Sequence, residues 1–295
     1  MKPSSIIFLI LSLILIIGGI ITCVIASAMA KGNDLPLFSQ VKTPDGDLLY
    51  TCEYDPENIN RIELAIDTAT INVFSSEEDK IELLNFTEGS YSRGITSQAY
   101  VIDENFNLSQ LFVFDQGGFS FSGLRQYFRN FSFKPKEKTI NVYISSETIK
   151  SLSITLKEGV INIDDVSLAG DFNLNVTEGK VNLNNVSTSS YVKLSGDNCT
   201  ADIKGGNIKS LQYTVTKGEL KTEDITINAA KIALESGDIN LNLTEDITTY
   251  MIEAKTDSGK ITVDGSTYQE VLLQGEENED RKLDIKIKSG NIVLS

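Results

Sequence analysis

The sequence has no histidine among its 295 residues, and it has only three cysteines. Without histidine, Ser–His and Cys–His nucleophilic sites and histidine-ligated metal sites are excluded. Cys23, Cys52 and Cys199 are scattered, a pattern typical of neither a disulfide framework nor a zinc site. We interpret them as free thiols, and pairing of Cys52 with Cys199 stays open. The sequence therefore predicts no metal site, no cofactor and no catalytic residues.

Basic residues are also scarce. Lysine and arginine number 26 against 41 aspartates and glutamates, which gives a net charge of −15. Nucleic-acid binding needs clustered cations to meet the phosphates, so a nucleic-acid partner is excluded. The same balance argues against docking of the main body on anionic lipid.

One long apolar run stands at the start of the chain. Residues 6–25 carry no charge, and at ~1.5 Å per residue such a run spans the ~30 Å hydrocarbon core of a bilayer. We expect residues 1–31 to form a transmembrane anchor in the lipid bilayer. Cleavage as a signal peptide after Ala28-Met29-Ala30 and lipidation of Cys23 are the alternatives.

Charges beside this run predict its orientation. Lys2 and the free amine precede it, whereas aspartates follow Lys31, so the positive-inside tendency places the N-terminus in the cytoplasm and the remainder outside. The predicted location is the cell membrane, with a single pass. Residues 32–59 contain Gly, Asn, Asp and Pro, which predicts a linker with one short hairpin at Pro44-Asp45-Gly46.

A repeat occupies the rest of the sequence, most clearly from about residue 150 onward. Alternating strands enter and leave polar turns, and each turn contains a glycine. The turn glycines, most of them close to ~20 residues apart, are Gly159, Gly179, Gly196, Gly218, Gly237, Gly259 and Gly290. Self-similarity at such a period is typical of solenoid arrays.

Apolar residues alternate with polar ones on both sides of these turns. Phe172, Leu174 and Val176 precede Gly179, and Val181 follows it with the same parity, which predicts one buried face. A second polar corner closes several coils. We therefore predict an all-β fold: a β-solenoid of ~20-residue coils over residues 60–295, each coil with two strands and two corners.

The recurring step Ser236-Gly237-Asp238-Ile239 resembles the bacterial putative-adhesin family of β-strand-repeat domains. Residues 66–73 look like the opening coil of that family, with Ala69 where glycine is usual. Residues 141–144, followed by residues 152–154, look like its strand leading into the repeats. The resemblance covers about residues 60–295, implies no catalytic residues, and implies a domain that often follows a single membrane helix.

An aromatic and basic insertion at residues 119–138 interrupts the pattern. Four of its apolar residues have the spacing of an amphipathic helix, and it has five basic residues against one acidic residue. It is interpreted either as a lid on the end of the solenoid or as a membrane-surface contact. The residues expected at the membrane are Arg125, Tyr127, Phe128, Arg129 and Phe131.

The sequence also predicts a hairpin near its end. Residues 271–273 and 283–287 read as two strands joined by a polar loop. Lysines alternate with the apolar residues of the second strand, as in edge strands that resist unwanted pairing. We expect this hairpin to guard the last coil, and a partner that adds a strand to dock there.

These features favour a non-catalytic, extracytoplasmic module of the cell envelope that binds, scaffolds or senses envelope stress. Its expected partner is an envelope protein or a cell-wall polymer. The alternative is a β-helix enzyme acting on polysaccharide, with stacked carboxylates such as Asp164, Asp165 and Asp202. Convergence of these carboxylates in one groove would favour the enzyme.

Overall fold

The computed structural model describes residues 39–44, 47–53, 59–86, 92–96, 99–103, 113–115, 118–120, 137–145, 149–273 and 281–295. The strands before the repeat are β1 (Ser39–Lys42), β2 (Leu48–Glu53), β3 (Arg61–Ser75), β4 (Lys80–Leu84), β5 (Ser92–Thr96), β6 (Ala99–Asp103), β7 (Val113–Asp115), β8 (Gly118–Ser120) and β9 (Thr139–Ile144). The others are β10 (Ser151–Asp164), β11 (Ser167–Leu168), β12 (Phe172–Leu243), β13 (Met251–Ser258), β14 (Ile261–Val263), β15 (Ser266–Tyr268), β16 (Glu270–Leu273), β17 (Lys282–Ser289) and β18 (Ile292–Leu294). A short 3₁₀ helix, η2, spans Ile247–Thr249.

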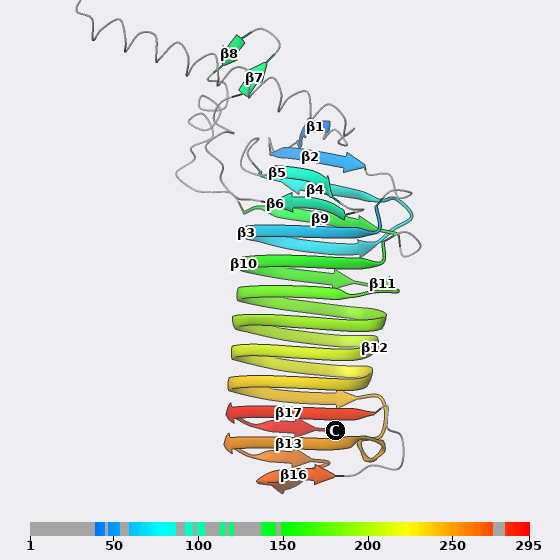
Figure 1. The fold of residues 1–295 in the computed structure, drawn as a ribbon, viewed down its shortest axis with the longest axis vertical. Coiled ribbons are helices and arrows are strands. Elements are labelled where there is room, and N and C mark those ends of the chain that lie inside the picture. The colour runs from blue at the N-terminus through cyan, green and yellow to red at the C-terminus, as the bar shows by residue number, and fades with distance from the viewer. Residues whose placement is uncertain are drawn as a thin grey trace, which may run out of the picture. The chain divides into compact units, whose positions relative to one another are not determined.

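Parallel stacking of coils builds the repeat domain (Figure 1). β10 lies between β3 and the first part of β12, with Ile154 opposite both Leu64 and Leu174. These apolar residues are buried, as the period-2 alternation predicts. Burial of each such side chain contributes about 1.5–3 kcal/mol, so the core between the strands stabilises the stack. The predicted all-β fold is confirmed.

Several coils have a third side that the sequence did not predict. β11 pairs with residues 187 and 188 of β12, and Leu168 on it is buried. The corner before this side has a left-handed residue, such as Asp165 (φ 56°) or Asn185 (φ 51°). Asn and Asp tolerate this conformation better than other non-glycine residues, so the polar corners have a backbone role.

The turn glycines form a ladder along the stack. Each coil is named here by its residue at this turn position, and the positions stack in the order Ala69, Gly159, Gly179, Cys199, Gly218, Gly237, Gly290 and Gly259. Cys199, not Gly196, occupies the turn position of its coil: Gly218 packs against the Cys199 carbonyl, whereas Gly196 packs against the backbone of Val176. The predicted alignment of that coil was therefore wrong by three residues, because Ser195-Gly196 imitates the usual turn sequence.

Asparagine side chains form a second ladder on the outer face. Asn182 Nδ2 donates to Asn162 Oδ1 at 2.7 Å, and Asn162 Nδ2 donates to Asn72 Oδ1 at 2.8 Å. Asn72 Nδ2 donates to Asn141 Oδ1 at 3.0 Å, and Asn141 Nδ2 donates to Glu82 Oε2 at 3.4 Å. Each bond contributes roughly 0.5–1.5 kcal/mol and fixes the register between two coils.

Chain order and stacking order differ at the start of the repeat. β3 pairs with β10 on one side and with both β6 and β9 on the other. The predicted opening coil, residues 66–73, is therefore covered by an outer coil made of β6 and β9. The predicted lead-in strand, residues 141–144, lies across β3 from the repeat that follows it in sequence.

The same exchange occurs at the opposite end of the stack. β17 pairs with the Gly237 part of β12 on one side and with β13 on the other, so the Gly290 coil lies between the Gly237 and Gly259 coils (Figure 1). β16 pairs antiparallel with β13. The predicted hairpin of β16 with β17 is therefore wrong, and the lysines of β17 do not guard an edge.

Antiparallel strands cover both ends of the stack. β4 pairs with β9, β2 with β4, and β1 with β2, while β5 pairs with β6. β15 and β16 cover the Gly259 coil. β1 and β2 thus lie within the stretch expected to be a linker, and they join the sheet through β4.

Two predicted segments lie outside the described residues. The apolar run at residues 6–25 is one, and within the described residues the structure has no helix long and apolar enough to cross a membrane. Residues 121–136, with all five proposed membrane-contact side chains, are the other. In chain order, β8 precedes these residues and β9 follows them.

Candidate functional site

The described surface of the stack has hollows, and two of them are considered as candidate sites. The first, the lysine-rimmed groove, crosses five coils and has a volume of about 460 Å³. Its lining residues are Gly196, Thr214, Val215, Thr216, Ala233, Leu234, Glu235, Lys255, Asp257, Lys286, Ile287 and Lys288. Small residues in the Cys199, Gly218 and Gly237 coils leave the space, and longer side chains of the Gly290 and Gly259 coils rim it.

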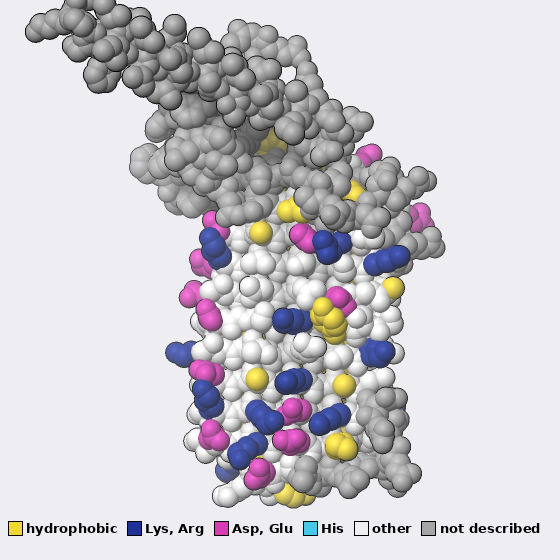
Figure 2. Space-filling view, in the orientation of Figure 1, with side chains coloured by type: hydrophobic (Ala, Val, Ile, Leu, Met, Phe, Trp, Pro, Cys, Tyr) yellow, Lys and Arg dark blue, Asp and Glu magenta, His cyan; other side chains and the backbone are white. Residues whose placement is uncertain are grey.

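Carboxylates balance the lysines of this groove. Lys286 Nζ lies 3.4 Å from Glu253 and 3.1 Å from Asp284, and Lys255 lies 3.6 Å from Glu270. The hydrogen bond from Lys286 to Asp284 raises the pKa of the lysine. Figure 2 shows charged side chains of both signs mixed over β17 and β13. Exposed pairs of this kind contribute little to stability, and together they leave the rim with little net charge.

The second hollow, the hydroxyl groove, lies on the third side of the coils and has a volume of about 570 Å³. Its lining residues are Ser167, Leu168, Ala169, Ser187, Thr188, Ser189, Asn207, Lys209 and Asn228. They recur at the same positions of the Gly159, Gly179, Cys199 and Gly218 coils. The row of hydroxyl and amide groups is therefore a direct product of the repeat.

Hydrogen bonds hold the base of the hydroxyl groove. Thr188 is buried, and its hydroxyl donates to the Gly170 carbonyl at 2.6 Å. Ser189 donates to the Ala169 carbonyl at 2.9 Å, and the backbone N–H of Asn207 donates to the Ser187 hydroxyl at 3.1 Å. The base is thus fixed by coil-to-coil bonds.

A glycine pair, Gly205-Gly206, precedes Asn207 at the corner of the Cys199 coil. Where neighbouring coils have the buried Val186 and Ile225, the Cys199 coil has Gly206, with φ 88°. A Cβ at Gly206 would overlap the Val186 carbonyl oxygen and lie 2.7 Å from the Val186 nitrogen. Only glycine allows so close an approach at this φ, so the Cys199 coil packs tightly on the Gly179 coil next to Asn207.

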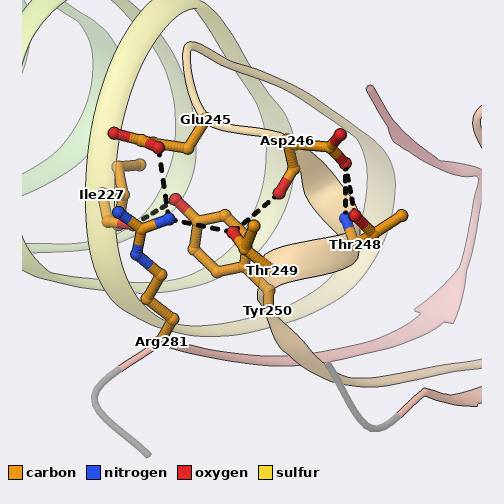
Figure 3. Close-up of polar contacts among 7 residues, drawn as sticks. All are labelled: Ile227, Glu245, Asp246, Thr248, Thr249, Tyr250 and Arg281. Carbon is orange, nitrogen blue, oxygen red and sulfur yellow. Dashed lines mark hydrogen bonds and ion pairs between the residues drawn. The ribbon is translucent and has the colours of Figure 1, made fainter. Parts of the chain in front are cut away.

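A cluster of polar side chains lies where the chain passes from the Gly237 coil to the Gly259 coil, which are separated in the stack by the Gly290 coil. Figure 3 shows Arg281, at the start of the Gly290 coil, between Glu245 and Thr249. Its Nη1 lies 3.2 Å from Glu245 Oε2 and 2.9 Å from Thr249 Oγ1, and its guanidinium lies 5.7 Å from the centre of the Tyr250 ring. The Tyr250 hydroxyl donates to the buried Ile227 carbonyl at 2.7 Å. The cluster therefore joins residues of four coils, which indicates a structural role.

Buried polar side chains occur in the irregular Cys199 coil and in the neighbouring Gly218 coil. Burial raises the pKa of Cys199 to about 12. The Tyr213 hydroxyl lies 2.9 Å from the Cys199 carbonyl and 3.1 Å from that of Glu219, and burial raises its pKa as well. Cys52 and Cys199 are both buried free thiols. Neither thiol is placed to react with solutes in the folded chain.

The predicted turn glycines have the backbone geometry of close packing. Positive φ occurs at all of them except Gly196, with Gly237 at 135° as an example. A Cβ at Gly237 would overlap the Gly218 carbonyl oxygen, and one at Gly196 would overlap that of Val176. These glycines allow coils to approach at their turns, and they are not a ligand site.

The carboxylates of the enzyme alternative do not converge. Asp164 and Asp165 accept hydrogen bonds from Asn184 at 2.6 Å and Asn185 at 2.9 Å. Asp202 lies in the Cys199 coil, two coils away, and follows Asn162 and Asn182 in the row of the asparagine ladder. The described residues also hold no group of three His, Cys, Asp or Glu side chains suited to a metal ion.

Sequence reasoning missed both grooves. The hydroxyl groove had a usable signal, because Ser167, Ser187 and Asn207 recur at a spacing of 20 residues, as the bond between the last two shows. The lysine-rimmed groove had none, because it depends on the Gly290 coil lying inside the stack.

Stacked parallel coils with a glycine ladder and capped ends define a β-solenoid repeat domain. The family model described as Toastrack DUF4097 matches residues 59–295, and the chain belongs to that family. No curated protein matches the sequence.

The chain is also similar to several solved structures, at low sequence identity. A putative cell adhesion protein from Clostridium sporogenes is 12% identical with a TM-score of 0.39, over 83% of this chain and 97% of its own. Putative adhesins from Bacteroides fragilis (13%, TM-score 0.46) and Parabacteroides distasonis (10%, TM-score 0.47) each match 84% of this chain and 97% of their own. A putative lipid binding protein from Parabacteroides distasonis is 14% identical, with a TM-score of 0.34, over 84% of this chain and 96% of its own.

Proposed function

We propose that this protein is a non-catalytic, membrane-anchored module of the cell envelope that holds a rigid binding surface outside the membrane. The apolar run at residues 6–25 supports the anchor, and its flanking charges support an extracytoplasmic repeat domain. Membership of the Toastrack family supports a solenoid scaffold. A scaffold of this kind presents grooves that cross several coils, which suits an extended partner such as an envelope protein or a cell-wall polymer.

The observation that carries this proposal is that polar side chains of the stack form hydrogen bonds between coils. Asp164 and Asp165, the best candidates for acid–base chemistry, accept hydrogen bonds from the next coil. A general acid or base must instead reach a substrate proton, with its pKa matched to the task. The asparagine ladder likewise uses its amides to hold the coils in register. Polar groups used in this way favour a rigid scaffold.

Cell fractionation tests the location. We expect the full chain to stay in the membrane fraction after washes with high salt and alkali, because a spanning helix is not displaced by either. Protease added to intact protoplasts should remove the repeat domain. A processed chain that begins at Lys31 and leaves the membrane, or a repeat domain protected from protease, would contradict the proposal.

Crosslinking tests the binding role. Intact cells expressing the protein are treated with a crosslinker, and the captured material is identified by mass spectrometry and sugar analysis. We expect reproducible capture of one envelope component by the intact protein. A matched control is Gly237→Val, which should disrupt the stack while leaving the anchor unchanged. Equal capture by both proteins would show that the folded repeat is not the binding surface.

A further inference from the structure

We propose that the hydroxyl groove binds a glycan chain that carries carboxylate or phosphate groups. The inference rests on the proposed function and adds the place and the chemical class of the partner. The groove lies on the third side of the stack.

The groups along the groove match the chemistry of sugars. Sugar hydroxyls both donate and accept hydrogen bonds, and so do serine hydroxyls and asparagine amides. Within the described part of the chain, the side chains of Asn207 and Asn228 have no protein partner. Their amides are therefore available to a ligand, whereas Thr188 and Ser189 are held by backbone carbonyls beneath them.

Charge favours an acidic ligand over a neutral one. The lining of the hydroxyl groove contains no carboxylate, and it contains Lys209. The whole chain has a net charge of −15, so a surface without acidic side chains is where an anion meets least repulsion. An ammonium group has three donors and no acceptor, which suits a carboxylate or phosphate oxygen.

The shape favours a chain-like ligand. The lining side chains come from consecutive coils, which are spaced by about 4.8 Å, close to the advance of one ring along an extended glycan. Equivalent positions of these coils therefore form a row along which successive rings of a glycan can lie.

Titration calorimetry on the purified full chain in detergent tests the site. The probes are a hyaluronan hexasaccharide, which carries carboxylates, and chitohexaose, which is neutral. We expect saturable binding of the hyaluronan probe and weaker binding of chitohexaose. Lys209→Glu should weaken binding of the hyaluronan probe by about fivefold to tenfold, because it replaces an exposed attraction by a repulsion. The affinity for chitohexaose, which has no charge, should change little.

Two further variants locate the binding. Ala169→Phe should fill the hollow and abolish binding of both probes while the melting temperature stays close to that of the parent. The matched control is Lys193→Glu, an equal charge change at an exposed position of the same coil on another side, and it should leave binding unchanged.

The outcomes separate this inference from the proposed function. If neither probe binds the parent protein, or if Lys209→Glu and Lys193→Glu behave alike, the glycan site is refuted. A membrane-retained chain with a protease-accessible repeat domain would then still support the envelope module. Binding at the groove by a chain whose repeat domain is cytoplasmic would support the site and contradict the proposed function.

Discussion

Adding a single methyl group at a turn glycine tests how the coils are held together. In Gly237→Ala, the new Cβ would overlap the carbonyl oxygen of Gly218 and lie 2.8 Å from its carbon. The residue would also keep a φ of 135°, where an L side chain is strained. Strain at such a position costs about 1–3 kcal/mol. Relief of the overlap requires the two turns to separate.

The cost of separation follows from the hydrogen bonds beside the turn. Moving the Gly237 turn from the Gly218 turn weakens at least two ladder bonds, each contributing roughly 0.5–1.5 kcal/mol. Together with the strain, we expect Gly237→Ala to lower the free energy of unfolding by about 3–4 kcal/mol. Urea denaturation of the full chain in detergent, followed by circular dichroism, measures this change.

Two other glycines separate strain from overlap. Gly265 has φ 76°, and a Cβ added there would have nothing within 4 Å, so Gly265→Ala should cost only about 1 kcal/mol. Gly196 lacks a positive φ but lies against the Val176 carbonyl, so Gly196→Ala tests overlap alone. If Gly237→Ala is no more destabilising than Gly265→Ala, the coils are not held in close contact at their turns and the reasoning is refuted.

Three further predictions concern the irregular parts of the stack. Arg281→Met should lower the free energy of unfolding by about 1 kcal/mol, because it removes the partly exposed bonds to Glu245 and Thr249. It should also speed proteolysis next to the Gly290 coil, and an unchanged rate of proteolysis would contradict a structural role for the cluster. Deletion of residues 281–295 removes an internal coil and should cause aggregation or unfolding, which size-exclusion experiments detect. A monomeric, equally stable product would show that the Gly259 coil can pack on the Gly237 coil without the Gly290 coil between them. The pKa of Cys199 is raised from 9.0 to about 12, so the neutral thiol stabilises the folded state below pH 9, and this contribution is lost as pH rises from 9 to 12. The free energy of unfolding should fall by up to about 1.4 kcal/mol per pH unit in this range, and less steeply in Cys199→Ala.

Local patterns allowed the sequence to predict the strands and their buried faces. Phe172, Leu174 and Val176 are buried as expected, because side-chain alternation is a property of the strand itself. The third side was missed because β11 has only two residues, too few for a periodic pattern. The alignment of the Cys199 coil was missed because one glycine resembles another in sequence, whereas the turn position is set by contacts with the next coil.

The order of the coils could not be predicted from the sequence. β13 and β17 present similar alternating apolar residues, such as Ile252 and Leu283, and either could pack on the Gly237 coil. The deciding factor lies in β15 and β16, which pair antiparallel with β14 and β13. Because these return strands end the parallel stack, the coil that carries them is outermost. The lysine-rimmed groove depends on this order and was missed with it.

The Gly290 coil between the Gly237 and Gly259 coils has a consequence for synthesis. A growing chain could add most coils one at a time as they emerge, each onto the one before. The Gly259 coil cannot take its final place until residues 282–294 have been made, because its parallel neighbour is β17 and not β12. That end of the stack is therefore completed after translation of this region, and until then residues 251–273 must be kept from pairing elsewhere.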